Sequence, residues 1–541
     1  MRWWGWGEDR EEAPLPEAAE ALLRDELGVD PSARSPHVSI EQVGLPESGL
    51  SQELGGRLAA AAGSADAFDD SREARIAHAA GRSYPDLVRL RAGDGSGAPD
   101  AVLRPRSSDR IAPLLAACAD AGVAVVPFGG GTSVVGGVAT VRDGFAAAVS
   151  LDLTGLDRVV AIDRTSLTAT LEAGLLGPEA ERRLGAEGLT LGHFPQSFEY
   201  STVGGWVATR SAGQASTGYG RIDELVEGVR LVAPAGELGT RALPATAAGP
   251  DLRELVVGSE GVLGVICEAT LRVRPAPEAR RYEGWSFRSF AEGRDALRQM
   301  AQADACADVA RLSDEPATRL TLAFGTGTGG RREQLARRYL RMRGHEGGCL
   351  AIMGFEGGED EVEQRRLAAA RHLRAGGGLG LGRGPGEAWL RSRFSAPYLR
   401  DDLLGRRVLV ETLETATSWS NLEALYDAVG AALRTALQAR GTPPLVLCHI
   451  SHLYRSGASL YFTFLARQED DALGQWEAAK SAAGEAIVGA GATITHHHAI
   501  GRDHARWMRA EVGELGLDLI RAAKARLDPA GIMNPGKLLP G

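Results

Sequence analysis

The chain has 541 residues, with 60 Lys and Arg against 70 Asp and Glu, and the resulting net charge of −10 argues against a nucleic-acid binder. Its hydrophobic content of 44% excludes wholesale disorder, and no apolar run reaches the about 18 residues of a membrane-spanning helix. The five cysteines form no CxxC pair, which excludes zinc ribbons and redox dithiols and favours a reducing cytosol. The start, MRWWGWGEDREE, has no apolar signal core, which disfavours secretion.

The first half of the chain predicts a polar, helical N-terminal region over 1–95 and an α+β domain over 96–275. Pro16–Leu27 has a helical pattern, and Asp94–Pro99 (DGSGAP) is typical of a linker. Ser108 is expected to cap a helix whose apolar residues recur at helical spacing. Strands are expected at Ala101–Arg104, Val123–Pro127, Ala147–Leu153, Val159–Ile162, Leu167–Glu172 and Val262–Val273.

The second half predicts another unit of strands and long helices over 276–495 and a C-terminal segment over 496–541. Ser420 and Glu423 stand three apart before an amphipathic run, which predicts a capping box at the start of a helix. The tail is expected to be helical up to Leu527. Further strands are expected at Leu445–Ile450, Leu460–Phe464 and Ala492–Thr495.

Glycine makes up 70 of the 541 residues, well above its usual share of about 7%. The richest loop, Pro127–Gly137 (PFGGGTSVVGG), follows a predicted strand, where α/β proteins place phosphate loops. Missing Cβ atoms let backbone N–H groups converge on an anion, and Thr132 and Ser133 add donors. The loop lacks the Lys of a Walker motif, so ATP hydrolysis is disfavoured. These residues alone leave a phosphate loop and a glycine-lined turn both open.

Other glycine-rich stretches allow similar alternatives. Ser201–Arg210 (STVGGWVATR) indicates close approach of a flat ligand or of another backbone, and the glycines of Gly258–Ile266 (GSEGVLGVI) punctuate the entry to a strand. A packing turn is the alternative for each. Gly325–Gly330 satisfies GxGxxG after a strand-like Leu320–Phe324, but without a βαβ partner we interpret it as a loop. Residues 376–386 (GGGLGLGRGPG) predict a mobile lid or a disordered loop rather than a site.

Taken in order, PFGGGTSVVGG, PQSFEYSTVGGWVATRSAG, GSEGVLGVI and the C-terminal NPGKLL resemble the FAD-binding flavoproteins of the vanillyl-alcohol oxidase (PCMH) type. The resemblance covers roughly residues 95–541. Within that superfamily the chain is similar to the alkyldihydroxyacetonephosphate synthase (alkylglycerone-phosphate synthase) family. The segments that carry this similarity are RWWGWG at the start, the ATR segment, ARLSD at 310–314, YLRD at 398–401, LYF at 460–462 and THHH at 495–498.

The resemblance implies an α+β fold. It consists of a two-subdomain FAD-binding domain over 96–275, an α+β cap domain with an antiparallel sheet over 276–495, and helical N- and C-terminal segments. The FAD contacts it implies are Phe128, Gly129, Gly130, Gly131, Thr132, Ser133, Val134, Pro195, Gln196, Ser197, Phe198, Glu199, Tyr200, Ser201, Thr209, Arg210, Ser211, Ala212, Glu260, Gly261, Val262, Leu263, Gly264, Val265 and Ile266. The glycine loop holds no His or Cys, so noncovalent FAD is expected.

The resemblance also implies a catalytic group. Tyr461 matches the family's tyrosine acid/base, which needs nearby positive charge because a phenol has a pKa of about 10. His496, His497 and His498 match a triplet important for activity. Arg311 matches a second residue important for activity, and Arg400 the residue that grips the substrate phosphate. Residue type alone favours a half-buried tyrosine and solvated arginines. No metal site is expected, since adjacent histidines alternate sides of an extended chain.

The reaction implied by the resemblance replaces the acyl group of 1-acyl-dihydroxyacetone phosphate with an alkyl group from a long-chain fatty alcohol, in ether-lipid synthesis. Flavin N5 would hold the substrate carbon during the exchange, with no net redox change. A long-chain substrate implies transient membrane contact, although no clear amphipathic anchor is seen. A homodimer is open. The Arg, Ala and Gly bias suits a bacterial, cytoplasmic protein, and the end, LPG, lacks a peroxisomal tripeptide.

Two alternatives stay open. An FAD-dependent D-2-hydroxy-acid dehydrogenase or oxidase of D-lactate or glycolate type would share the FAD loops, with His498 as the general base. The His triplet and Tyr461 favour the synthase over this alternative. A flavin-binding protein without catalysis is disfavoured by the intact candidate residues.

Overall fold

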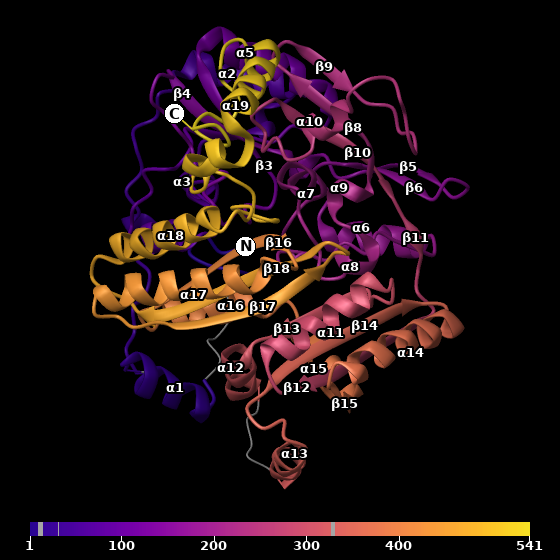
Figure 1. Cartoon of the computed structure of the whole chain (residues 1–541). Helices are drawn as coiled ribbons and strands as arrows, with labels where there is room; N and C mark the ends of the chain where they lie inside the picture. The colour runs from indigo at the N-terminus through magenta and orange to yellow at the C-terminus, as the bar shows by residue number, and fades with distance from the viewer. Residues whose placement is uncertain (9–14, 31, 326–330, 541) are drawn as a thin grey trace.

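The computed structural model describes residues 1–8, 15–30, 32–325 and 331–540, and its strands form four sheets (Figure 1). The first sheet has the order β1-β2-β4-β3, in which β2, β4 and β3 are parallel. Its inner strands, β2 and β4, are buried along their whole length, as expected for parallel strands covered on both faces. The strands are β1 (Phe68–Asp69), β2 (Ala101–Leu103), β3 (Val123–Phe128) and β4 (Ala147–Asp152).

The second sheet is antiparallel with the order β5-β6-β10-β8-β9, and a small pair, β11-β7, lies at its side. Together with the first sheet it forms the two halves of the expected FAD-binding region. The strands are β5 (Val159–Asp163), β6 (Thr168–Glu172), β7 (Leu189–Thr190), β8 (Val226–Ala233), β9 (Gly236–Gly239), β10 (Val265–Arg272) and β11 (Arg274–Pro275).

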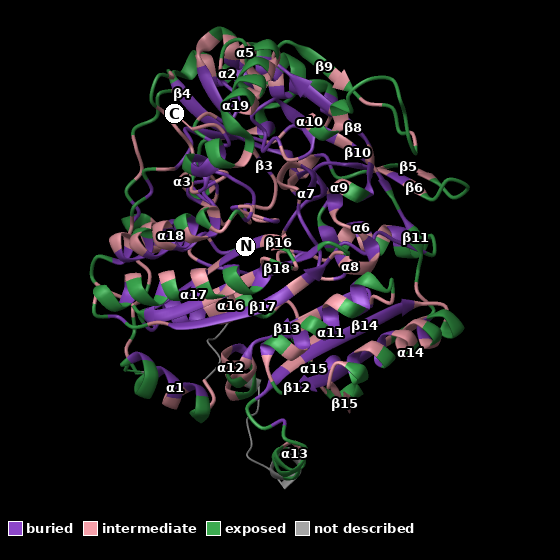
Figure 2. Cartoon of the chain, viewed as in Figure 1, coloured by how far each residue is buried: buried purple, intermediate pink, exposed green. Residues whose placement is uncertain are grey.

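The third large sheet is the expected antiparallel sheet of the cap, with the order β15-β12-β14-β13-β17-β18-β16. On β18, Phe462 and Phe464 belong to the largest hydrophobic core, while Tyr461 and its neighbours on the other face stay free of that core. The buried strands stand out in Figure 2. The strands are β12 (Ala279–Phe287), β13 (Val309–Ser313), β14 (Cys349–Gly357), β15 (Leu379–Gly382), β16 (Val408–Ser418), β17 (Leu445–Leu453) and β18 (Gly457–Arg467).

Helices cover the sheets, with α17 and α18 along one face of β16–β18 and α11 and α14 beside β12–β14 (Figure 1). The helices are α1 (Glu17–Leu27), α2 (Gln52–Ala62), α3 (Arg72–Ala77), α4 (Tyr84–Arg91), α5 (Ile111–Ala121), α6 (Gly177–Ala186), α7 (Val203–Thr209), α8 (Ser216–Tyr219), α9 (Ile222–Leu225), α10 (Leu252–Val256), α11 (Phe290–Gln302), α12 (Glu315–Gly325), α13 (Arg331–Met342), α14 (Glu359–Ala375), α15 (Arg383–Ser392), α16 (Ala396–Leu404), α17 (Leu422–Ala439), α18 (Ala472–Gly489) and α19 (Met508–Leu527). Among the described residues, no helix has both the length and the hydrophobicity to cross a bilayer.

Two predicted caps are wrong in detail. The side chain of Ser107, not Ser108, accepts the capping N–H before α5, while the Ser108 hydroxyl accepts a hydrogen bond from Arg230 at 2.9 Å. The expected capping box of α17 is also absent. Asn421 takes the cap position there, and Glu423 instead forms an ion pair with Arg294 at 3.1 Å.

Three glycine-rich or strand-like predictions are also corrected. Leu320–Phe324 lies within helix α12 rather than in a strand, and most of the GxGxxG stretch, 326–330, lies outside the described residues. Residues 376–386 are not a loop: they form the edge strand β15 and the start of α15. Ala492–Thr495 contributes only one bridge, from Thr493 to Ala416.

The chain ends pack on the FAD-binding region. Strand β1 from the N-terminal part pairs with β2, and Met533 near the C-terminus forms a bridge to Val125 of β3. The boundaries at 95, 275 and 495 stay predictions. The fold places the glycine-rich segments next to the face of β16–β18 that carries Tyr461.

Candidate functional site

A cavity of about 450 Å³ lies where the FAD-binding region meets the cap sheet. From one side it is lined by three of the glycine-rich segments, and from the other by β16, β17 and β18. Its volume lies within the range of ligand pockets, about 300–1,000 Å³. The cavity therefore brings together residues from distant parts of the chain, from Trp6 to Asn534 (Figure 1).

Most of the expected FAD contacts line this cavity. They are Phe128, Gly129, Gly130, Gly131, Thr132, Ser133, Val134, Pro195, Gln196, Ser197, Ser201, Thr209, Ser211, Ala212, Glu260, Gly261, Gly264 and Ile266. A Cβ on Gly130 would lie 1.6 Å from the carbonyl oxygen of Tyr200, so the first glycine loop packs directly against the second segment. Glycine is needed here for contact between backbones.

The remaining expected contacts do not line the cavity. Phe198 stacks on Phe394 with ring centroids 5.5 Å apart. Arg210 turns away and forms ion pairs with Asp223 and Glu254. The others outside the lining are Glu199, Tyr200, Val262, Leu263 and Val265, of which the three aliphatic residues are buried in hydrophobic cores.

The cavity walls carry polar atoms that suit a polar ligand such as FAD. The side-chain oxygens of Gln214 and Asn534 are buried and have no hydrogen-bond partner among the described residues, although both residues line the cavity. A buried polar atom without a partner is costly, so it points to a ligand group. Sequence reasoning missed both residues, although Asn534 lies in the NPGKLL segment that carries the resemblance.

Tyr461 lines the polar end of the cavity, among the histidines expected to act with it. Its partner across the strands is His449 on β17, and their rings stack at 4.9 Å. The rings of His497 and His498 approach from the C-terminal segment at 6.0 and 5.5 Å. Burial raises the pKa of Tyr461 to about 12, so the phenol is protonated near neutral pH.

Glu414 organises the histidine triplet. It pairs with Tyr461 in register on β16, and its buried carboxylate accepts the backbone N–H of His496, His497 and His498 at 2.6, 3.0 and 2.9 Å. Burial alone would raise the pKa of Glu414, but the imidazoles of His497, His498 and His496, with a side-chain hydrogen bond from His497, hold it well below its usual range. The triplet therefore curls around one carboxylate instead of ending a strand.

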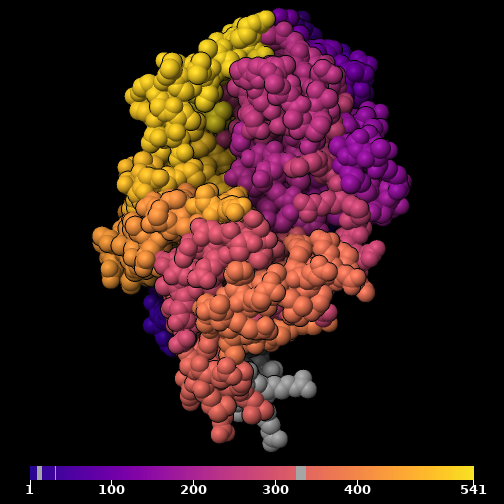
Figure 3. Space-filling model, turned by 45° about the vertical axis from the view of Figure 1, so that its right-hand side comes forward, coloured from indigo at the N-terminus to yellow at the C-terminus, as the bar shows by residue number. Residues whose placement is uncertain are grey.

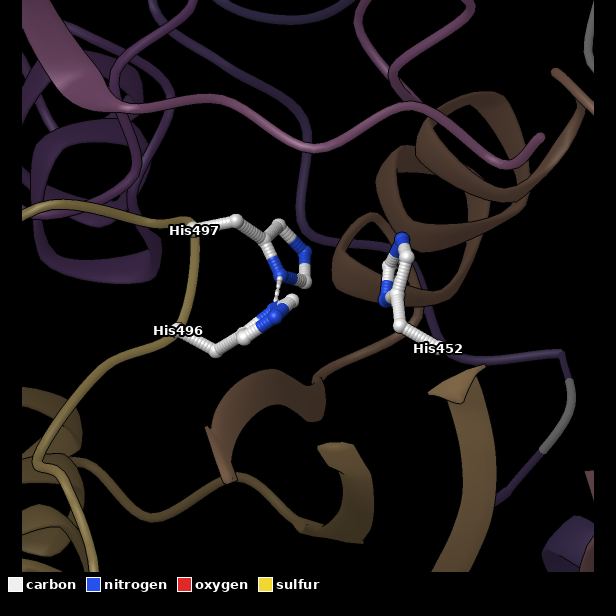
Figure 4. A group of neighbouring side chains, drawn as sticks. All are labelled: His452, His496 and His497. Carbon is white, nitrogen blue, oxygen red and sulfur yellow. Dashed lines mark hydrogen bonds between the residues drawn. The ribbon is translucent and has the colours of Figure 1, made fainter. Parts of the chain in front are cut away.

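This curl brings together side chains that an extended chain would separate. His496 and His497 point toward His452 of β17, and Nδ1 of His496 lies 3.0 Å from Nδ1 of His497 (Figure 4). One ring nitrogen from each of the three histidines lies within 4.8 Å of the others, close enough to hold a metal ion. The premise that adjacent histidines alternate sides is wrong for this loop. His497 and His498 line the cavity, and His496 lies behind them.

Both ring nitrogens of His452 and His496, and Nδ1 of His497, already have partners. The hydroxyl of Tyr454 lies 2.5 Å from Nε2 of His496, and Nε2 of His452 lies 3.0 Å from the Gly213 carbonyl oxygen. Nδ1 of His452 approaches the hydroxyls of Ser451 and Ser459. These contacts form a hydrogen-bonded chain from the cavity to Tyr454.

Arginines supply positive charge to the same cavity. Arg311 on β13 lies 3.2 Å from Nδ1 of His449, and burial lowers its pKa to about 10, so it remains charged. Arg400 on α16 binds Asp401 and donates to the Arg82 carbonyl oxygen at 2.6 Å. Arg82 also lines the cavity. Three guanidinium groups thus offset the overall acidity locally.

The N-terminal RWWGWG segment contributes to this wall, which sequence reasoning did not foresee. Trp6 lines the cavity and its ring meets Tyr200 edge-on at 5.5 Å. The backbone N–H of Trp6 donates to Asp401, the same carboxylate that binds Arg400. His449 and His452 were also missed, because a buried strand of hydrophobic composition gave no signal for a site.

Polarity changes along the cavity. The register between β16 and β18 pairs Glu414 with Tyr461 and, four residues along, Val410 with Leu465. The aliphatic end is closed by side chains from α12 and α16. These are Leu320, Phe324, Leu399 and Leu403. The end of the cavity at Tyr461 is therefore polar, while the other end is apolar.

The buried histidines predict acid sensitivity. Burial lowers the pKa of His193, His452 and His498 to about 3, and it also holds His449, His496 and His504 well below their usual range. Below about pH 6.5 the unfolded chain binds protons that the folded protein excludes. The free energy of unfolding therefore decreases as the pH is lowered, by up to about 1.4 kcal/mol per pH unit for each such histidine.

We therefore expect the free energy of unfolding to drop by several kcal/mol between about pH 7 and pH 5. Urea unfolding at fixed FAD concentration measures this. His193→Phe, which removes one of these groups, is expected to flatten the dependence. A stability that is constant over this range would contradict the prediction.

Comparisons with known proteins agree with this geometry. A family model for an FAD binding domain matches residues 99–240, and one for the C-terminal domain of FAD linked oxidases matches 276–538. The alkyldihydroxyacetonephosphate synthase of Dictyostelium discoideum is 34% identical over 88% of this chain and 79% of its own length. The synthase of Trypanosoma brucei brucei is 35% identical over 86% and 77%.

A solved structure of an alkyldihydroxyacetonephosphate synthase superposes with a TM-score of 0.85 at 30% identity, covering 99% of this chain and 98% of its own. The fold expected from the sequence is thereby confirmed, and so is FAD as the cofactor.

Proposed function

The chain belongs to the alkyldihydroxyacetonephosphate synthase family, and on that premise we propose that it exchanges the acyl group of 1-acyl-dihydroxyacetone phosphate for the alkyl group of a long-chain alcohol. The product is an ether-lipid precursor. The observation that carries the proposal is the cavity in which Tyr461, packed against His449, His497 and His498, meets the FAD segments and three arginines.

In this exchange the bond between C1 and the acyl oxygen breaks and a bond between C1 and the alcohol oxygen forms. The fatty acid leaves, the alcohol loses its proton, and no electron is gained or lost overall. FAD, when bound, supplies an electron sink beside C1. Tyr461 takes the proton at C1 and returns it. Because burial keeps the phenol protonated near neutral pH, the phenol must lose its own proton before it can take the proton at C1.

The glycine loop around 129–131 would hold the FAD pyrophosphate through backbone N–H groups, with Thr132 and Ser133 as further donors. The other two segments would wall the flavin ring. No His or Cys lies within Pro127–Gly137, which supports noncovalent binding. Flavin released into solution on acid denaturation tests this.

Substrate binding follows from the polarity of the cavity. Arg400 would grip the phosphate, because a planar guanidinium binds phosphate through two hydrogen bonds, and Arg311 would add charge near Tyr461. The aliphatic end beyond Val410 and Leu465 suits the long chain. The His452, His496 and His497 cluster serves proton movement and not a metal, a reading supported by the partners its nitrogens already have.

The same proposal includes the cellular setting of the protein, its contact with membranes and its oligomeric state. The Arg, Ala and Gly bias supports a bacterial, cytoplasmic setting, although the two synthases compared above are eukaryotic. Long-chain substrates support transient contact with a membrane surface. A homodimer is also proposed.

The test titrates oxidised enzyme without oxygen. We expect palmitoyl-dihydroxyacetone phosphate to bleach the flavin without net reduction of an electron acceptor, and D-lactate to leave the flavin oxidised. Steady acceptor reduction by D-lactate would instead favour a 2-hydroxy-acid dehydrogenase, in which His498, at the cavity wall, takes the hydroxyl proton.

A further inference from the structure

Trp6 carries a hydrogen-bond donor that has no partner in the part of the chain that the structure describes. The side chain is 3% exposed and lines the cavity, and its Nε1 atom is buried without an acceptor. An indole N–H can donate but not accept, and a buried donor without a partner destabilises the fold. A ligand in the cavity that offers an acceptor oxygen next to Trp6 would remove this cost, so the unpaired N–H points to such a ligand.

The loop that carries Trp6, residues 2–7, lies at the junction between the FAD-binding region and the cap (Figure 1). The side chains of these two parts meet along a continuous boundary in the space-filling view (Figure 3). Arg82 donates to two carbonyl oxygens of the loop at 3.2 and 2.9 Å. On the other side, a Cβ on Gly5 would lie 2.5 Å from Oδ2 of Asp401, so glycine lets the loop pack against α16. Contacts of the backbone therefore fix the position of Trp6.

Trp6 and Arg400 border the same part of the cavity. The backbone N–H of Trp6 donates to Oδ2 of Asp401, and Nη2 of Arg400 donates to Oδ1 of the same carboxylate at 2.9 Å. Nε of Arg400 also donates to Oδ1, at 3.2 Å, and Nη1 donates to the Arg82 carbonyl oxygen. These bonds use three of the five N–H donors of the guanidinium, so Arg400 can still donate to a ligand. A ligand bound by Arg400 would thus lie beside Trp6.

The charges around this loop favour an anion. Nη2 of Arg2 lies 3.5 Å from Oδ2 of Asp401, and Arg82 donates to the loop from the other side. Burial and the neighbouring Arg400 lower the pKa of Arg82 to about 10, so this guanidinium stays charged near neutral pH. Three guanidinium groups therefore surround one carboxylate. A phosphate suits this arrangement, because its oxygens accept hydrogen bonds from guanidinium and indole N–H groups alike.

We propose that the indole N–H of Trp6 donates to the phosphate of the substrate, in the subsite that contains Arg400. That the substrate carries a phosphate rests on the proposed function, whereas the unpaired donor does not. A planar guanidinium binds two oxygens in its own plane, and a tetrahedral phosphate presents a third oxygen outside that plane. Trp6 would bind this third oxygen, which a carboxylate lacks. The indole therefore makes the subsite selective for a phosphate ester.

Three variants separate the N–H group from the bulk of the ring. Trp6→Phe keeps an aromatic ring without a donor. Trp6→His restores a donor on a smaller ring, since Nε2 of an imidazole takes the place of Nε1 of an indole. The control is Trp4→Phe in the same loop, because Trp4 stacks on His37 at 4.1 Å and does not belong to the cavity lining. All three variants keep the backbone contacts that hold the loop.

The experiment is a calorimetric titration of the full-length, FAD-loaded protein with 1-hexyl-dihydroxyacetone phosphate, a short and soluble analogue of the product, and with the same ketone without its phosphate. We expect Trp6→Phe to raise the Kd of the phosphate ester roughly ten- to hundredfold, since the lost bond is to a charged group, and to leave the Kd of the phosphate-free ketone unchanged. Trp6→His should bind the ester more tightly than Trp6→Phe, and Trp4→Phe should bind it like the parent protein. FAD affinity should be the same throughout.

Several results would overturn the proposal. Equal binding of the ester by the parent protein and Trp6→Phe would leave the indole without a role in binding. Equal weakening for both ligands would place the contact on the carbon skeleton, and weaker binding by Trp6→His than by Trp6→Phe would assign the loss to packing. A fall in FAD affinity alone would assign the N–H to the cofactor. If the parent protein itself did not bind the ester, the proposed function would fail as well, which distinguishes that case from the others.

Discussion

Tyr461→Phe should abolish alkyl exchange while FAD remains bound, with a loss of at least about a hundredfold and up to about ten-thousandfold in kcat. The change removes only the hydroxyl, and the ring can keep its stacking on His449 and His497. Flavin absorbance and thermal stability should therefore stay close to the parent values. Exchange is measured with radiolabelled alcohol at saturating substrate, so that a change in binding cannot mimic a change in rate.

Tyr426 on helix α17 provides a matched control. Tyr426 on α17 donates to Asp314 at 3.1 Å and stacks on Phe462, on the face of the sheet opposite the cavity. Tyr426→Phe removes the same hydroxyl from a half-buried ring, so it should cost about 1 kcal/mol of stability and leave exchange intact. Turnover by Tyr461→Phe at the rate of the control would remove the tyrosine from the mechanism.

The sequence predicts the strand that carries Tyr461 but not the environment of the tyrosine. Leu460–Phe464 alternates between faces, so its position in a sheet follows from local pattern. Its neighbours come from β17 and from the segment after 495, and pairing between distant strands leaves no local signal. The positive charge that a tyrosine base needs is present in Arg311, but burial raises the pKa of Tyr461 by more than Arg311 lowers it.

For the glycine-rich segments, too, the sequence predicts one part of the structure and packing decides the rest. Their motifs are sufficient to recognise the FAD region, since a backbone that touches a ligand or another backbone needs glycine locally. Which individual residues face the cavity depends on packing: Val262 and Leu263 lie next to Gly261, yet they point into the core. The loop prediction for 376–386 fails because pairing with β12 orders even a glycine-rich stretch.

The histidine triplet is the clearest case of a motif whose geometry the sequence could not supply. Three consecutive histidines in an extended strand would diverge, and this was the basis for excluding a shared site. The buried carboxylate of Glu414, 82 residues before His496 in the chain, accepts their N–H groups and curves the loop around itself. Ala499, directly after the triplet, has a positive φ of 74°. Glu414 had no signal in the sequence beyond a position in a strand.

Glu414→Gln should therefore have a large effect on both stability and exchange. An amide oxygen can replace part of the carboxylate, but the NH₂ group cannot accept the remaining N–H groups, and the charge facing the imidazoles is lost. We expect a loss of about 3 kcal/mol in the free energy of unfolding and a fall in kcat of at least about a hundredfold. Urea unfolding and exchange by the folded fraction measure these two effects.

A destabilised protein could lose activity merely because less of it is folded, so the control must be another buried carboxylate away from the cavity. Glu356 accepts from the hydroxyls of Tyr219 and Tyr282 at 2.8 and 2.6 Å and does not line the cavity. Glu356→Gln should destabilise the fold comparably and leave kcat unchanged. His498→Ala, which leaves Glu414 in place, should abolish exchange with a smaller loss of stability. If both glutamine variants lost stability and activity in equal proportion, Glu414 would affect exchange only through the stability of the fold.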